Sequence, residues 1–251
     1  MTPNRTVTTL ALALSGPLAC KGAPPATTTA AQDGGSSRVQ LWPGITEETS
    51  PGDLSTAWTS SWLNGAFSLK DGVLPDHPIR RLTSCADLEG VAENDVVLSR
   101  GWEHYNFREK FVRCRVMSRL RTARAARVGY VRDLVELDDL GDVLPAGVAP
   151  VLGPDAKTTH SWRAADPTLK FDREGARGGY HELIVHGAYR GRVTWLAAGD
   201  LDGDGIEDVV LFSNLARSSE GPGATLDNII RAFALTRRQP GGAVSIVEQF
   251  E

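Results

Sequence analysis

The stretch Ala198-Gly-Asp-Leu-Asp-Gly-Asp-Gly-Ile-Glu-Asp-Val-Val-Leu-Phe212 decides how the second half of the chain is interpreted. Four aspartates occupy positions 1, 3, 5 and 9 of a loop, and Gly205 stands at position 6, where such loops turn sharply. Carboxylates this close repel one another unless a cation lies between them, and Ca²⁺ prefers about six to eight oxygen ligands. The spacing therefore predicts Ca²⁺ as a cofactor; an acidic β-turn without metal is the alternative. The predicted ligands are Asp200, Asp202, Asp204, Asp208 and the backbone carbonyl of Ile206.

The residues after the loop predict a strand rather than a helix. Val209–Phe212 is a short apolar run, and Leu211 stands at position 12, where an EF-hand needs a bidentate Glu. A DxDxDGxxD loop that enters a strand resembles the FG-GAP / VCBS calcium loop of integrin-like propellers and many secreted bacterial proteins. The resemblance covers about fifteen residues and implies a calcium-stiffened β-hairpin. The family repeats the loop around a propeller, whereas this chain has one copy, so no propeller is expected.

The rest of the C-terminal half predicts an antiparallel meander of about five strands. Gln239-Pro240-Gly241-Gly242 has Pro and Gly where a type II turn needs them. The fold class is predicted as α+β, with an α-rich N-terminal half whose helices pack on one face of the sheet. The regions are 41–153 (α-rich) and 154–251 (β). The predicted strands are Tyr180–Gly187, Arg192–Ala198, Asp208–Asn214, Asn228–Arg237 and Ala243–Phe250.

The α-rich half contains one long segment, Trp102–Ala126, that has no Gly or Pro and is predicted as a helix. Its arginine-rich face has two interpretations: contact with anionic lipid phosphates, or, preferred, a solvated face neutralised by the acidic run Glu136–Asp142. Asp53 is predicted to cap a short helix that carries Trp58. This Trp and Trp62 are expected to be buried anchors, with a carbohydrate platform as the alternative.

The amino terminus predicts export. Residues 1–19 combine a basic start, a short apolar run and small residues, as in a signal peptide. Leu18-Ala19-Cys20 resembles a bacterial lipobox, which implies lipidation of Cys20, and Lys21 after it implies the outer membrane, facing the periplasm or the cell surface. Residues 20–40, rich in Ala, Thr, Pro, Gly and Ser, predict a flexible tether.

The three cysteines fit this address. If Cys20 carries lipid, Cys85 and Cys114 remain as an even pair, which an oxidising compartment would close as a disulfide. The alternative is two buried free thiols.

No catalytic motif stands out in the sequence. His181 and His186 flank a Glu, but they are spaced i, i+5, whereas a zinc protease needs i, i+4 on a helix. The net charge of −4 gives no reason to expect a nucleic-acid partner. The sequence therefore favours an envelope protein with one structural calcium loop, acting in binding or architecture. Its expected partners are the membrane, through the lipid, and an envelope protein or glycan; a secreted hydrolase stabilised by calcium is the alternative.

Overall fold

The computed structural model describes residues 39–43, 45–46, 53–63, 67–70, 81–98, 101–150, 160–173, 181–217 and 228–251, all within the unit Gly35–Glu251. The predicted signal peptide, Cys20 and the predicted tether up to residue 38 lie outside these residues. So does the predicted region boundary at 153/154.

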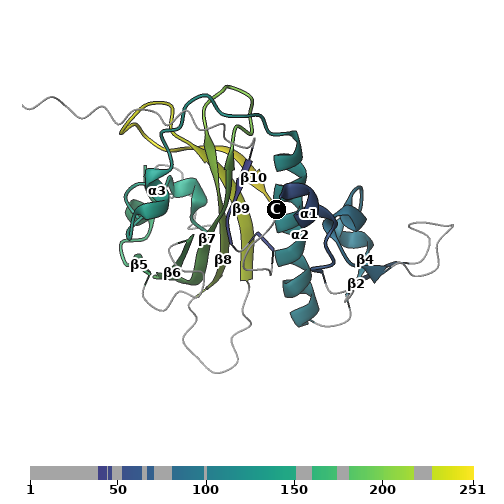
Figure 1. Ribbon diagram of the computed structural model, residues 1–251. Coiled ribbons are helices and arrows are strands. Elements are labelled where there is room, and N and C mark those ends of the chain that lie inside the picture. Colours follow the sequence, from purple (N-terminus) through teal and green to yellow (C-terminus); the bar gives the residue numbers. More distant parts are fainter. Residues whose placement is uncertain are drawn as a thin grey trace, which may run out of the picture. The chain divides into compact units, whose positions relative to one another are not determined.

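A seven-stranded antiparallel sheet dominates the C-terminal half (Figure 1). Six of its strands follow one another in chain order, from β10 at one edge to β5 at the other. This confirms the α+β class and the predicted meander. The strands are β5 (Lys170–Asp172), β6 (Glu182–His186), β7 (Tyr189–Gly199), β8 (Asp208–Arg217), β9 (Asn228–Thr236) and β10 (Ser245–Phe250).

Two short strands of this sheet were not predicted. β5 pairs with β6, and β1 (Val39–Leu41), which begins at the end of the predicted tether, pairs with the last residues of β7. Each is three residues long, too short for an alternating pattern to be recognised. The predicted turn after β9 is present: Gly241 has φ +66°, and the Gly242 amide donates to the Gln239 carbonyl at 3.0 Å.

Helical segments cover both faces of the sheet, so the prediction of one covered face is wrong. On one face lie α1 (Leu54–Thr59) and α2 (Gly101–Thr122) with the 3₁₀ turn η1 (Cys85–Leu88). On the other lie α3 (Asp133–Glu136), α4 (Trp162–Ala165) and the 3₁₀ turn η3 (Ala146–Val148). Figure 1 shows α2 and α3 on opposite sides of the strands.

Residues of β8 show why both faces are covered. Val210 and Phe212 belong to the hydrophobic core under α2, and Val209 and Leu211 belong to the core on the other face. Successive side chains of a strand point to opposite faces, so a continuous apolar run must be buried on both.

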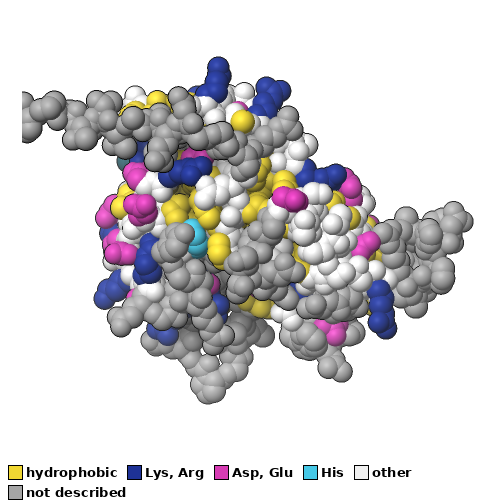
Figure 2. Space-filling view, in the orientation of Figure 1, with side chains coloured by type: hydrophobic (Ala, Val, Ile, Leu, Met, Phe, Trp, Pro, Cys, Tyr) yellow, Lys and Arg dark blue, Asp and Glu magenta, His cyan; other side chains and the backbone are white. Residues whose placement is uncertain are grey.

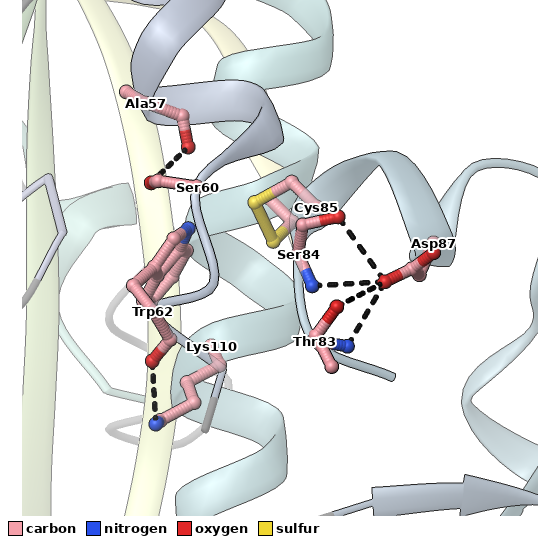
Figure 3. Close-up of a disulfide and its surroundings, with 9 residues drawn as sticks. Ala57, Ser60, Trp62, Thr83, Ser84, Cys85, Asp87 and Lys110 are labelled. Atoms are coloured by element: carbon pink, nitrogen blue, oxygen red, sulfur yellow. Dashed lines mark hydrogen bonds between the residues drawn. A yellow bond between two sulfur atoms is a disulfide. The ribbon is translucent and has the colours of Figure 1, made fainter. Parts of the chain in front are cut away.

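The disulfide Cys85–Cys114 is present and joins η1 to α2, with the two Cα atoms 5.1 Å apart. Figure 3 shows the bond beside Asp87, whose Oδ2 accepts from the backbone amides of Thr83 and Ser84 at 2.9 and 3.0 Å. The turn that carries Cys85 is therefore fixed by its own capping carboxylate as well as by the disulfide.

Further short elements complete this half. Asp53 caps α1 by accepting from the Thr56 amide at 2.8 Å, as predicted. Trp58 and Trp62 are 6% and 5% exposed, which confirms their interpretation as buried anchors.

A small sheet follows the order β3-β2-β4. Its elements and the neighbouring 3₁₀ turn are β2 (Phe67–Leu69), β3 (Arg81–Leu82), β4 (Val96–Val97) and η2 (Glu93–Asp95).

Four arginines of α2 form ion pairs, but none of their acidic partners belongs to the run Glu136–Asp142. Arg113 pairs with Glu109 within the helix at 2.7 Å, and Arg119 pairs with Glu248 of β10 at 2.9 Å. The acidic run instead forms ion pairs with Arg163 and Arg173. The prediction that it neutralises the arginines of the helix is therefore wrong. Figure 2 shows the result near α3 and β5, where basic and acidic side chains lie side by side.

Candidate metal centre

The acidic loop connects two long central strands. β7 ends at Gly199 and β8 begins at Asp208, and these two residues are paired across the sheet. The loop therefore starts and ends on one rung of a well-buried hairpin, which fixes the distance between its first and last carboxylates. This is the β-hairpin arrangement expected from the sequence.

Short-range hydrogen bonds shape the loop. The two carboxylate oxygens of Asp200 accept from the amides of Gly203 and Gly205 at 2.7 and 3.0 Å. Asp202 and Asp204 each accept from the amide two residues on, at 3.0 and 2.7 Å. Gly203 and Gly205 have φ of +86° and +87°, which side chains with a Cβ disfavour. The predicted sharp turn at Gly205 is thus present, and Gly203 adds a second one.

Three of the four aspartates converge. Asp200, Asp202 and Asp208 each offer an oxygen, and these oxygens lie within 4.8 Å of one another. Asp200 is 2% exposed and Asp208 is fully buried, whereas Asp202 is exposed. The group could hold a metal ion, and hard carboxylate oxygens are the ligands that Ca²⁺ and Mg²⁺ prefer.

Asp208 is the unusual member of this group. Its Oδ2 accepts from the Leu201 amide at 2.8 Å, but its Oδ1 is buried without a hydrogen-bond partner in the part of the chain that the structure describes. The Thr236 hydroxyl, across the ladder from Asp208, lies close enough to lower the pKa of this carboxyl, but its geometry does not make a hydrogen bond to Oδ1. A buried polar atom with no partner is costly, so it points to something that binds there.

The pKa of Asp208 is raised, as expected for a buried carboxyl close to other carboxylates. Burial raises the pKa of its carboxyl to about 6, the hydrogen bond from Leu201 and the Thr236 hydroxyl oppose the rise, and the charges of Asp202 and Asp204 add to it. Burial and like charge both disfavour the ionised form. A cation between the carboxylates would relieve both.

Asp204 stands outside the converging group. One of its oxygens accepts from the Ile206 amide, and the other lies 4.0 Å from the Arg238 guanidinium. Ile206 forms an isolated parallel bridge with Val128. The structure thus brings together three of the five predicted ligands; the roles of Asp204 and of the Ile206 carbonyl stay predictions.

The segment that follows α2 forms hydrogen bonds with the acidic loop. The backbone of Arg124 exchanges hydrogen bonds with Asp200 at 2.9 and 3.2 Å, and the Arg127 amide donates to the Gly205 carbonyl at 2.8 Å. Arg132 binds the two carboxylate oxygens of Glu207, whose side chain is 10% exposed. Sequence reasoning missed this support, because the partners are far apart in the chain and an Arg–Glu pair leaves no local pattern.

His181 and His186, whose spacing does not fit a zinc protease, lie apart from the acidic loop. His186 is exposed at the end of β6, whereas His181 is buried and stacks on Trp42 with ring centroids 5.5 Å apart. Because β6 is a strand, the His-Glu sequence has no helix on which to form a zinc site.

Comparison with known proteins gives no further assignment: no family model, curated protein or solved structure matches the chain. The resemblance to the FG-GAP / VCBS loop therefore rests on the loop residues alone. The geometry supports an acidic group that could hold a metal ion.

Proposed function

We propose that this chain is an exported, lipid-anchored envelope protein in which a structural Ca²⁺ fixes the β7–β8 loop, and that it acts in binding or architecture. The observation that carries the calcium proposal is the buried Asp208 carboxylate, with its unpartnered oxygen, in one group with Asp200 and Asp202. Asp204 and the Ile206 carbonyl are the proposed further ligands, and water completes the shell.

The position of the loop indicates what the ion does. The loop backbone is bonded to residues 124–128, which follow α2, and Glu207 is bonded to Arg132, just before α3. Ca²⁺ at the loop therefore stabilises the chain segment that passes from one face of the sheet to the other. This is a structural role, and it needs no catalytic group.

Thermal unfolding tests the calcium proposal. The free energy of unfolding should rise with calcium by about 1.4 kcal/mol per tenfold increase above the dissociation constant. Asp202→Asn removes one exposed ligand charge and should reduce that gain by at least about 1.4 kcal/mol at a given calcium concentration, which corresponds to a site at least tenfold weaker. Asp142→Asn, an exposed acid that pairs with Arg163, is the matched control and should retain it. An unchanged midpoint of the wild type between chelator and about 10 mM calcium would contradict the proposal, because extracellular sites are mostly filled there.

Export is supported by the disulfide, which is typical of proteins outside a reducing cytoplasm. None of the described helices is long and apolar enough to cross a membrane. Attachment through acyl chains on Cys20, followed by the tether, is the proposed link to the outer membrane.

Cell fractionation tests the anchor. Cys20→Ala should move the protein from the membrane to the soluble fraction and abolish incorporation of labelled fatty acid. Cys85→Ala combined with Cys114→Ala is a control that removes the other two cysteines and should leave the protein on the membrane. A wild-type protein that is already soluble would contradict lipidation.

A further inference from the structure

A polar cleft lies between the first half of α2 and strands β6 to β9, away from the acidic loop. Its volume is about 420 Å³, within the range of about 300–1,000 Å³ that small-molecule sites occupy. Tyr105, Glu109 and Arg113 contribute the helix wall, and Phe212 and Asn214 of β8 lie on the sheet wall.

The sheet wall of this cleft is polar where a core would be expected. Glu182, Thr194 and Phe212 form one row across β6, β7 and β8, and Arg192 and Asn214 form the next. Phe212 shows that this is the face that packs against α2. Charged groups on such a face cost free energy, and proteins break the apolar pattern in this way mainly where a function requires it.

The helix wall holds its side chains in fixed positions. The Arg113 guanidinium lies 4.2 Å from the Phe212 ring centroid and pairs with Glu109 at 2.7 Å, and its side chain is 12% exposed. The Asn214 amide donates to the Tyr105 hydroxyl and, at 3.4 Å, to Glu109. Groups ordered in advance lose little entropy when a ligand binds.

The charge of the cleft favours an anion. Among the described lining residues, three arginines stand against two glutamates, which leaves one positive charge. Glu109 pairs with Arg113, and Glu182 lies 3.9 Å from Arg192. Arg190 lines the cleft and has no ion-pair partner within the described ranges.

Gly191, which lies between Arg190 and Arg192 on β7, has no room for a side chain. A Cβ on Gly191 would lie 2.1 Å from the Asn214 carbonyl oxygen. The backbones of β7 and β8 therefore lie close together at Gly191. As a result Arg190, Arg192 and the Asn214 side chain lie next to one another on the sheet wall of the cleft.

We propose that this cleft binds a small hydroxylated acid, either a sugar acid or a sugar phosphate. Arg190 and Arg192 take the anionic group, because guanidinium forks match carboxylate and phosphate oxygens. The hydroxyls of the ligand bind the side-chain carbonyl oxygen of Asn214, the Thr194 hydroxyl and the glutamate carboxylates. An apolar ligand does not fit, because the ring of Phe212, the one phenylalanine among the described lining residues, is already covered by Arg113, and Tyr105 carries a hydroxyl.

Titration of the isotope-labelled full-length protein, followed by amide NMR, tests the proposal. The probes are gluconate and glucose 6-phosphate, which separate carboxylate from phosphate, with glucose as the uncharged control. At least one of the two acids should shift the backbone amide signals of Gly191 and Asn214, with a dissociation constant of about 1 mM or tighter. Glucose should bind at least about tenfold more weakly, because it lacks the charge-assisted hydrogen bonds.

Two variants assign the effect to the cleft. Arg190→Gln should weaken binding about tenfold. Arg217→Gln, on the same hairpin but outside the cleft lining, should leave it unchanged. The proposal is overturned if neither acid shifts these amides at about 10 mM, if glucose binds equally well, or if Arg190→Gln binds like the wild type.

Discussion

At the scale of single residues, Asp208 sets the energetic problem that the metal proposal answers. Its carboxylate is fully buried, one oxygen lacks a partner among the described groups, and two other carboxylates lie close to it. An unpaired buried charge costs several kcal/mol in an apolar setting. The same residue should therefore destabilise the metal-free protein and stabilise the calcium-bound one.

Asp208→Asn tests this double role near neutral pH. In chelator the variant should be as stable as the wild type or more stable by roughly 1–2 kcal/mol, because the buried charge is gone and the amide oxygen still accepts from Leu201. In calcium the order should reverse, because the variant loses a ligand. Denaturant unfolding in both buffers gives the two differences. A stability difference between variant and wild type with the same sign in both buffers would contradict the proposed role of Asp208 as a calcium ligand.

His181 predicts a separate dependence on pH. Burial lowers the pKa of its imidazole, and the charge of Arg173 lowers it further. The unfolded state then binds more protons below about pH 6.5, so stability falls as pH drops through that value. His181→Phe keeps the stacking surface for Trp42 and should flatten this part of the stability curve. Equal slopes for the two proteins between about pH 7 and 5 would show that His181 does not contribute.

Part of the candidate site was predictable at this scale, and part was not. The spacing of Asp200, Asp202 and Asp208 predicted their convergence, because a turn with two glycines brings such positions together. The pair Arg132–Glu207 was not predictable, because the two residues are 75 positions apart and meet only through the packing of the segment after α2.

At the scale of elements, the disulfide ties η1 to α2 across a separation of 29 residues. Closing a loop of that length should contribute roughly 3–4 kcal/mol to the free energy of unfolding. The double variant Cys85→Ala, Cys114→Ala should lose about that amount while its circular dichroism stays native. Comparison with the reduced wild type separates the loss of the bond from the loss of the buried sulfur atoms. A loss below about 1 kcal/mol would show that the bond does little for stability.

The strands were predictable where they are long and buried. β6 to β10 each contain enough β-branched or apolar residues to be recognised, and the turn at Pro240-Gly241 separates the last two. The covering of both faces was also encoded, because Val209–Phe212 is a continuous apolar run rather than an alternating one. The helices on the second face were missed because α3 and α4 are only four residues long.

At the scale of the whole molecule, the two hydrophobic cores lie on opposite faces of one sheet, and the acidic loop lies at the end of its two central strands. The chain between residues 122 and 133 passes from one core to the other and is bonded to this loop on the way. Calcium at the loop should therefore stabilise both cores together, so that thermal unfolding with calcium is one cooperative transition.

A calorimetric calcium titration of the full-length protein measures directly whether the acidic loop binds Ca²⁺. We expect one site with a dissociation constant on the order of 10⁻⁴–10⁻³ M, because no residue in the loop supplies the bidentate Glu of tighter sites. Asp202→Asn should weaken binding at least about tenfold, and Asp142→Asn should bind like the wild type. Absence of binding heat in the wild type at about 10 mM calcium, or equal affinity of Asp202→Asn, would contradict a calcium site in this loop.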